Sequence, residues 1–515
     1  MTGQGGDGAL AAVGGPLGRH ASARARSWLA TVVPLLVLSS AMVGLGVAQR
    51  GHCIRNGWNG TDQFWRGCFS DLPALYRIGN LDTGLGGYLS GAASLDHPVL
   101  TGGLMALVGG LVPDGSVLDQ TRWYFLLWAV LAAALIAATV FLTAAARPRH
   151  PADAVAVAAS PLLVIAPLVS SDVFGVALVS AGIWAWARRH PLLAGVLLGL
   201  AATARTYPLL VLLALLLLGL RTGRLRVVGR ALLGAGAAVV LVLVPFLLSN
   251  PGAITAAYSA WAESSAGLGS PWILPQLLGH PLPNGAVTAL AVVGLLAAVV
   301  AGALFALGTD RRPSVAEVSL VMVGIALVTG KSFPVQASLW LLPLVALCAV
   351  RWRDHLIWAG AEAMHYAMVW LYIGAMSKPD RGLPGPWYAV FLTLRVAAVL
   401  YLVWRVWRTA AQRRPVEELV EEPGVEAAEA PVAGRAAEAP VAREPAEAPV
   451  TGEAAEALVA GEPVAPTTPE PVAPTTPEPV EGAGVTRKAE PDGVDQDELA
   501  GPFAGAADHL IVRIG

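Results

Sequence analysis

Long apolar runs, separated by short polar or basic connections, constrain this chain more than any other feature. Its 515 residues are 55% hydrophobic and 14% charged, with a mean hydropathy of +0.60. A soluble protein of this length needs more charge to cover its surface, whereas about 20 apolar residues suffice for one helix to cross a bilayer. The sequence therefore predicts an all-α polytopic membrane protein.

The apolar runs predict about twelve transmembrane helices. The predicted spans are 28–48, 122–146, 152–169, 173–187, 191–204, 206–220, 227–248, 285–307, 313–329, 334–350, 355–376 and 386–407. A further apolar run, 98–112, is too short to cross a bilayer and is interpreted as an interfacial or re-entrant helix.

Positive charge gives the expected orientation. The N-terminal segment carries Arg19, Arg24 and Arg26, and every second connection between predicted spans is basic. Because cytoplasmic loops are enriched in Lys and Arg, we expect both termini in the cytoplasm of a multi-pass plasma-membrane protein. The basic connections are 147–150, 188–190, 221–230, 310–312, 351–354 and the segment after Arg405.

Composition divides the chain into three parts. Residues 1–27 form a cytoplasmic N-terminal segment, and residues 28–412 form the transmembrane domain, with a large extracytoplasmic loop over 49–121. Residues 413–515 are rich in Pro, Ala and Glu, and Glu-Ala-Pro-Val recurs at Glu429, Glu438 and Glu447. Such a composition cannot bury a core, so we predict a disordered cytoplasmic tail.

The cysteines favour one disulfide and no metal centre. Cys53 and Cys68 flank part of the first outer loop, where a disulfide is compatible with the expected compartment. Three cysteines exclude a cysteine-rich metal site, and no nucleotide-binding or zinc-ligand spacing occurs. We expect no metal and no cofactor.

Asp71 is the first candidate for catalysis. It lies in the 68–76 stretch just outside the first predicted span, where a partly shielded carboxylate could act as a general base. The alternative is an ordinary solvated loop residue or helix N-cap. Asp62, Asp82 and Asp96 compete for the role, and Asp96-His97-Pro98 leads directly into the short apolar run.

Three more ionisable residues interrupt apolar runs at the outer side of the predicted topology. They are Asp172, Arg205 and Lys331. Charges at such a depth are costly and mark functional sites, although snorkelling to the interface is the alternative. Two cations at outward helix breaks would suit a phosphate at the membrane surface. Glu362 and His365, three residues apart, are expected to pair inside the bundle.

Several short motifs, in the same order, resemble the actinobacterial integral-membrane GT-C glycosyltransferases of glycosyltransferase family 87, which include polyprenol-phosphate-mannose-dependent mannosyltransferases. The motifs are Cys68–Tyr76, Asp96–Gly102, Ala194–Leu200, Arg205-Thr206-Tyr207-Pro208-Leu209, Gly330–Gln336 and Leu339–Pro343. The resemblance covers about residues 28–407.

The resemblance implies roles for individual residues. Asp71 would be the catalytic base, Asp172 would lie near the donor site, and Arg205 and Lys331 would contact the donor phosphate. Asp96, His97, Tyr207 and Gln336 lie in the same motifs and would bind substrate.

The expected activity is an inverting transfer of a sugar, with mannose the first choice, from a polyprenyl phosphate to a cell-envelope glycolipid or glycan. The expected partners are these two substrates and the bilayer, without nucleic acid. Two alternatives stay open: a lipid or glycan transporter, or flippase, in which buried charges mark a translocation path, and a non-catalytic scaffold for envelope synthesis.

Overall fold

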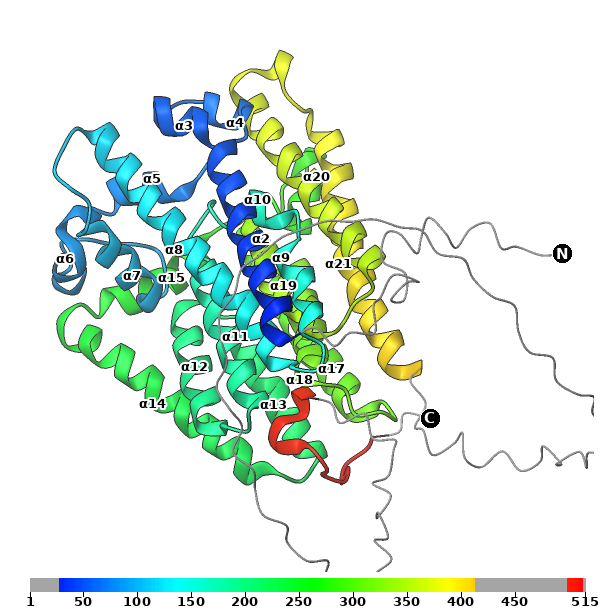
Figure 1. Cartoon of the computed structure of the whole chain (residues 1–515). Helices are drawn as coiled ribbons and strands as arrows, with labels where there is room; N and C mark the ends of the chain where they lie inside the picture. The colour runs from blue at the N-terminus through cyan, green and yellow to red at the C-terminus, as the bar shows by residue number, and fades with distance from the viewer. Residues whose placement is uncertain (1–26, 413–497, 513–515) are drawn as a thin grey trace, which may run out of the picture. The chain divides into compact units, whose positions relative to one another are not determined.

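The structure, a computed structural model, describes residues 27–412 and 498–512. Within these ranges the regular elements are all helices, and no strand occurs (Figure 1). An all-helical fold, predicted from the apolar runs, is therefore what the described residues form.

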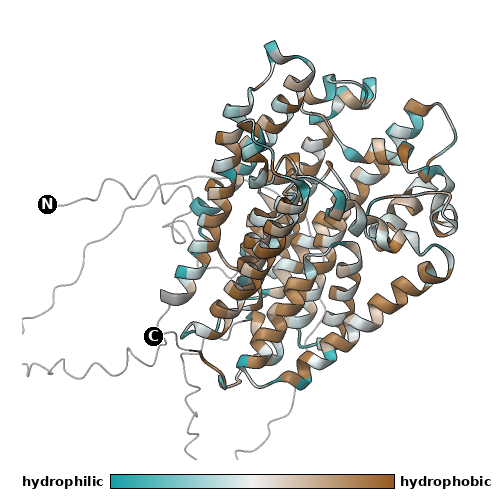
Figure 2. Ribbon diagram, turned by 180° about the vertical axis from the view of Figure 1, so that it is seen from behind, coloured by the Kyte–Doolittle hydropathy of each residue, from teal (hydrophilic) through white to brown (hydrophobic). Residues whose placement is uncertain are grey.

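Among the described residues, five helices are long and apolar enough to cross a membrane, which indicates a membrane protein. Their long faces are mostly apolar in Figure 2, with polar residues gathered toward the helix ends. These helices are α2 (Trp28–Gln49), α8 (Val117–Ala146), α14 (Leu225–Ser249), α17 (Asn284–Gly308) and α21 (Gly385–Gln412).

A second group of apolar helices is shorter, at 10–17 residues. Two of them, α11 and α12, begin and end where the sequence predicted spans. Twelve crossings stay a prediction, because these short helices fall below the length that spans a bilayer without help from neighbours. The group comprises α7 (Val99–Gly109), α11 (Val173–Ala187), α12 (Pro191–Ala204), α13 (Pro208–Arg221), α18 (Val315–Thr329) and the pair η4 (Val335–Ala337) and α19 (Ser338–Leu347).

The span predicted over 152–169 is not one helix, and that prediction was wrong. The segment breaks into η2 (Pro151–Ala154), α9 (Val155–Ala158) and α10 (Leu162–Ile165). Pro161 and Pro167 each lack a backbone N–H and clash with a preceding carbonyl, which disfavours a continuous helix here. The fully buried Arg50 binds carbonyls freed by the break, with Nη2 donating to Ile165 O at 2.7 Å.

Another long helix, α20 (Trp352–Ser377), is less apolar because buried charged and polar residues lie along it. Its Glu362 is buried and pairs with Arg395 of α21 at 2.8 Å. His365 instead contacts the hydroxyl of Tyr388, with Nε2 at 3.1 Å. The predicted pairing of Glu362 with His365 was therefore wrong: each residue has a partner on α21.

The region between α2 and α8 folds as a small helical layer rather than as a loop with a single helix. Its apolar side chains, among them Leu72, Tyr88 and Met105, form a second hydrophobic cluster together with side chains of α8 and α14. The layer contains α3 (Gly51–Asn56), α4 (Asp62–Trp65), α5 (Asp71–Ile78), η1 (Leu81–Thr83), α6 (Gly84–Ser90) and α7.

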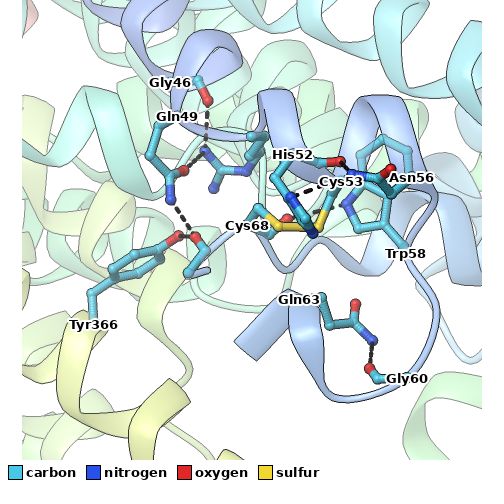
Figure 3. Close-up of a disulfide and its surroundings, with 12 residues drawn as sticks. Gly46, Gln49, His52, Cys53, Asn56, Trp58, Gly60, Gln63, Cys68 and Tyr366 are labelled. Carbon is cyan, nitrogen blue, oxygen red and sulfur yellow. Dashed lines mark hydrogen bonds between the residues drawn. A yellow bond between two sulfur atoms is a disulfide. The ribbon is translucent and has the colours of Figure 1, made fainter. Parts of the chain in front are cut away.

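A disulfide joins Cys53 and Cys68 in this layer (Figure 3). Beside it, the side-chain amide of Gln49 and the hydroxyl of Tyr366 both donate to the carbonyl of Gly67. The indole of Trp58 donates to the carbonyl of Cys68 at 3.1 Å. The disulfide and these bonds fix the backbone that leads into α5.

Short elements complete the described chain. They are α15 (Gly252–Glu263), η3 (Pro271–Ile273), α16 (Leu274–Leu277), η5 (Pro379–Arg381) and η7 (Glu498–Phe503).

The last of these corrects the prediction that residues 413–515 are disordered throughout. Residues 413–497 and 513–515 lie outside the described residues, but Leu499 and Phe503 are buried against the helices. The apolar side chains at this end of the segment give it a core to join, which the Pro/Ala/Glu-rich composition concealed.

Candidate active site

The helices alternate in direction, so their connections gather at two ends of the bundle. One end carries Asp172, Arg205 and Lys331, and we call it the site end. The other carries connections rich in arginine, and we call it the basic end. The connections of the basic end are 147–150, 188–190, 221–224 and 309–314.

Asp172 and Arg205 form a buried ion pair at the site end. Arg205 donates from Nε to Asp172 Oδ1 at 2.8 Å and from Nη2 to Asp172 Oδ2 at 3.0 Å. Such a bidentate pair is stronger than a single hydrogen bond and also fixes the orientation of the guanidinium relative to the carboxylate. Asp172 stands at the start of α11, and Arg205 adopts an extended conformation between α12 and α13, where Pro208 begins the next helix.

Three further side chains complete the surroundings of Asp172. The hydroxyl of Ser170 donates to Oδ2, and the indole nitrogen of Trp340 donates to Oδ1 at 2.8 Å. Ser171 accepts from Arg205 Nη2 at 3.3 Å. With Arg205 included, each carboxylate oxygen has two donors, so Asp172 is held as the anion and does not act as a free base.

Asp71 begins α5, next to this ion pair. Its backbone amide donates to Val169 O at 2.8 Å, which ties α5 to the segment that leads to Asp172. Ser70 caps the helix by accepting from the amide of Leu72 at 3.3 Å. The Asp71 carboxylate itself accepts no hydrogen bond within the described ranges.

The electrostatic setting of Asp71 suits a base. Burial raises the pKa of the Asp71 carboxyl to about 7; the Asp172 carboxylate adds to the increase and the Arg205 guanidinium opposes it. A carboxyl with a pKa near neutrality is partly ionised at working pH and binds a proton more readily than a free aspartate.

His97 lies in the same charge environment. Burial lowers the pKa of its imidazole to about 4, with Arg205 contributing and Asp172 opposing. The imidazole is therefore neutral at pH 7. Its Nδ1 is buried and has no hydrogen-bond partner among the residues that the structure describes. Thr101, one turn along in α7, donates to Ala204 O at 2.7 Å and holds α7 against the end of α12.

Lys331 follows α18 and is 1% exposed. Its ammonium donates to the carbonyls of Trp261 and Ala262 at 2.9 and 3.0 Å and lies 4.9 Å from the centroid of the Trp261 ring. Those carbonyls are the last of helix α15, where a cation is favoured. Within residues 27–412 and 498–512, no carboxylate pairs with this ammonium.

An apolar cavity of about 420 Å³ opens beside Lys331. Side chains from α13, α17 and α18 line it, together with Tyr207 and Trp340. The rings of these two residues stack with their centroids 4.7 Å apart, and the Tyr207 hydroxyl is buried with no hydrogen-bond partner in the described part of the chain. Because Trp340 also donates to Asp172, one residue joins the cavity to the ion pair.

The Lys331 loop is held from outside the cavity. Arg395 donates to the carbonyls of Phe333 and Pro334, and its guanidinium lies 3.5 Å from the Phe333 ring centroid. The backbone amide of Gly267 donates to Lys331 O at 2.8 Å, and Ser270 Oγ donates to Gly330 O at 2.7 Å. The loop is therefore fixed before any ligand binds.

The structure thus places most of the residues nominated from sequence in two adjoining groups. Asp71, His97, Asp172 and Arg205 form the first, and Tyr207 and Lys331 lie in the second. Asp96 is exposed, and Gln336 is absent from the cavity lining.

Three contributors were not among the sequence candidates: Trp340, Ser170 and Arg395. Trp340 lies within the Leu339–Pro343 motif, but the sequence assigned it no role in the site. Their partners lie far along the chain, except that Ser170 sits two residues before Asp172 and could have been found as a local cap.

Residues 116–330 match the family model of glycosyltransferase family 87. The matched region is that of a glycosyltransferase. No curated protein and no solved structure shows a significant match to the chain. The match supports the family resemblance for the motifs inside it, Ala194–Leu200 and 205–209. Asp172, Arg205 and Tyr207 lie inside the family 87 region, whereas Asp71 and His97 precede it and Lys331 follows it directly.

Proposed function

We propose that this glycosyltransferase moves a hexose, with mannose the expected sugar, from a polyprenyl-phosphate donor to a glycolipid or glycan of the cell envelope. The observation that carries the proposal is the junction of two features. The Asp71 carboxylate, which accepts no hydrogen bond within the described residues and has a pKa near neutrality, lies beside a buried ion pair. An apolar cavity adjoins that pair, and the Lys331 ammonium at its edge faces no carboxylate of the described residues.

The cavity and Lys331 suit the lipid phosphate. A buried cation without a carboxylate is costly unless an anion reaches it, and a phosphate monoester or diester supplies that anion. The apolar walls would then take the first isoprenoid units of the donor. Arg205 is already neutralised by Asp172, so it would position the phosphate or the sugar by hydrogen bonds rather than by net charge.

Asp71 would supply the base. In the proposed step, an acceptor hydroxyl oxygen attacks the anomeric carbon while its proton passes to the Asp71 carboxylate. The bond between the anomeric carbon and the phosphate oxygen breaks, and polyprenyl phosphate leaves with the electron pair. Lys331 stabilises the charge that develops on the departing phosphate. Sugar hydroxyls could hydrogen-bond to His97 Nδ1 and to the Tyr207 hydroxyl, which have no partner within 27–412 and 498–512.

Charge distribution supports a site outside the cytoplasm. The connections of the basic end are arginine-rich, which favours the cytoplasm for that end. The site end would then face the opposite compartment, where a disulfide such as Cys53–Cys68 persists. Nucleotide sugars do not occur there, so a lipid-linked donor fits the location.

Reconstitution tests the proposal. Purified protein is incorporated in vesicles with radiolabelled polyprenyl-phosphate mannose and an envelope lipid extract, and label transfer is measured. We expect transfer by the unaltered protein, loss of transfer with Asp71→Ala, and normal transfer with Asp82→Ala, an exposed aspartate of the same layer. Undiminished transfer in Asp71→Ala would remove the catalytic assignment. Lipid movement across the vesicle without sugar transfer would support a transporter instead.

A further inference from the structure

The segment 498–512 lies against the basic end, far from α3 and α4 (Figure 1, red). Leu499 and Phe503 are 2% and 1% exposed. The Phe503 ring meets the ring of Trp186, near the end of α11, edge to face at 4.9 Å. These two side chains are apolar anchors that hold the segment against the ends of the helices.

The backbone of the segment comes closest to α11 at Gly501. This glycine has a φ of +53°, and a Cβ there would lie 2.2 Å from the carbonyl oxygen of Trp186. Any other residue would be strained and would collide with α11. This close contact between the two backbones indicates that the segment packs specifically against α11.

Asp508 provides the main polar contact. Its Oδ2 accepts from Arg221 Nη2 at 2.7 Å and from Nε at 2.9 Å, and its Oδ1 accepts from Arg312 at 3.3 Å. Arg221 is fully buried, and its remaining described bonds go to the carbonyls of Ala306 and Asp310. Within the described residues, Asp508 is the carboxylate that neutralises Arg221.

Backbone bonds extend the contact along the segment. The amides of His509 and Leu510 donate to Arg221 O at 2.7 and 3.2 Å, and that of Val512 donates to Leu307 O at 2.9 Å. At the other end, Glu498 accepts from the amide of Arg149 at 2.8 Å. One short segment therefore joins the end of α8, the end of α11, the end of α13 and the α17–α18 connection.

The segment contacts three helices, or the connections next to them, at the basic end. The opposite ends of these helices lie at the candidate site. Helix α11 begins directly after Asp172, α13 begins directly after Tyr207, and α18 ends two residues before Lys331. Each is 14 or 15 residues long. Because a packed helix moves as a rigid element, fixing one end restricts the other.

We propose that the basic end carries a peptide-binding groove whose ligand is the chain's own segment 498–512, and that its occupation holds α11, α13 and the α17–α18 connection in the arrangement that forms the site. The ligand class is a short peptide with two apolar anchors, a glycine between them and a carboxylate five residues after the second. Residues 413–497 connect it covalently to α21, so its binding is intramolecular. The effect on the site rests on the proposed function, but the groove itself does not.

Cutting the tether in the intact protein tests the groove. A recognition sequence for a specific protease is placed at position 455 of the full chain, and the protein is cleaved after purification. We expect the C-terminal fragment to stay bound through size-exclusion chromatography and to leave on dilution, which gives a dissociation constant. A fragment that separates at once from the unaltered protein at the purification concentration overturns the proposal.

Substitutions in the segment supply the specificity test. We expect Asp508→Asn to raise the dissociation constant about tenfold or more, since it leaves a buried arginine without a carboxylate. Phe503→Ala should act in the same direction, as the loss of a buried aromatic anchor. Leu510→Ala is the matched control, because that side chain is 43% exposed. Equal affinities for all four fragments would contradict the assigned contacts.

Sugar transfer tests the coupling to the site. After cleavage and dilution, we expect transfer to fall about fivefold, in the range of coupling free energies between sites. A synthetic peptide of residues 498–512 should restore it, whereas the same peptide with Asp508→Asn should not. A loss that the peptide cannot restore, or transfer that is unchanged when the fragment leaves, overturns the coupling. If the uncleaved protein transfers no sugar at all, the proposed function fails while the binding measurements still decide the groove.

Discussion

Asp71 and Glu362 are both partly or fully withdrawn from water, but the protein treats them in opposite ways. Glu362 lies inside the bundle with Arg395 at 2.8 Å, and that arginine in turn holds the Lys331 loop. Asp71 lies at the site end without a hydrogen-bond donor in the described chain, and its pKa is raised to about 7. Paired charges in the interior hold the structure, whereas Asp71 and Lys331 have no oppositely charged partner among the described residues and can interact with a charged or polar substrate.

The largest expected difference between the two carboxylates is in their contribution to the stability of the fold. We expect Glu362→Gln to lower the free energy of unfolding by about 3–5 kcal/mol, because it removes the carboxylate that neutralises the buried Arg395 guanidinium. Thermal unfolding in detergent, followed by loss of the monodisperse peak, measures the change. Glu263→Gln, at an exposed position, is the control and should leave the transition in place. Equal transitions for both variants would show that the ion pair does not hold the fold.

The next effect concerns catalysis. We expect Asp71→Asn to lower kcat about 100-fold or more, the contribution of a positioned general base. The donor KM should change little, since the amide keeps the size of the carboxyl group. Initial rates of label transfer at saturating acceptor measure it, with Asp82→Asn beside it. A large rise in KM with kcat intact would make Asp71 a binding residue instead.

Lys331 gives a smaller and different change. We expect Lys331→Met to raise the donor KM about tenfold with a smaller effect on acceptor KM, because a desolvated cation facing phosphate is worth a few kcal/mol at most. Titration of transfer against donor concentration measures it, and Lys378→Met at an exposed position is the control. An unchanged donor KM would separate Lys331 from the phosphate.

The pH profile should show Asp71 directly. The base must be ionised, so kcat/KM should rise with pH through about 7 and lie about tenfold below its plateau at pH 6. Rates in a series of buffers at constant ionic strength measure the profile, and the limb should be absent from the residual activity of Asp71→Asn. A limb below pH 5 would mean that the carboxyl is not shielded as the structure indicates.

The smallest effect has the opposite sign to that of Glu362→Gln. The pKa of Asp71 is higher in the folded protein than in the unfolded chain, so the folded state binds the proton more tightly. Stability from this group is present below pH 4 and is lost as pH rises through 7. We therefore expect Asp71→Asn to stabilise the protein at pH 8 by about 1 kcal/mol, a figure reduced for partial exposure. A destabilised Asp71→Asn protein would place Asp71 with Glu362 among the structural carboxylates.

The sequence predicted the parts of this structure that local chemistry decides. Pro191 and Pro208 mark the starts of α12 and α13, and ionisable residues between apolar runs nominated Asp172, Arg205 and Lys331. The local sequence did not predict that Arg205 would form an ion pair with Asp172, 33 residues away, because that pairing depends on how α11 packs against α12.

Composition misled in two places. The 152–169 run is apolar enough to span, but its prolines break it, a signal that was present in the sequence and outweighed by hydropathy. The tail after Arg413 was treated as one low-complexity segment, although Leu499, Phe503 and the final apolar residues differ from the repeats before them. Composition taken over short windows separates these apolar residues from the Pro/Ala/Glu-rich repeats.

The disulfide between Cys53 and Cys68 has a practical consequence. It ends three residues before Asp71 and fixes the backbone that Gln49 and Tyr366 hold at Gly67. A thiol reductant added during purification would release that backbone and free α5 to shift relative to the ion pair. Preparations made in reducing buffer should therefore fold but transfer sugar poorly, and activity assays of this protein belong in buffers without thiols.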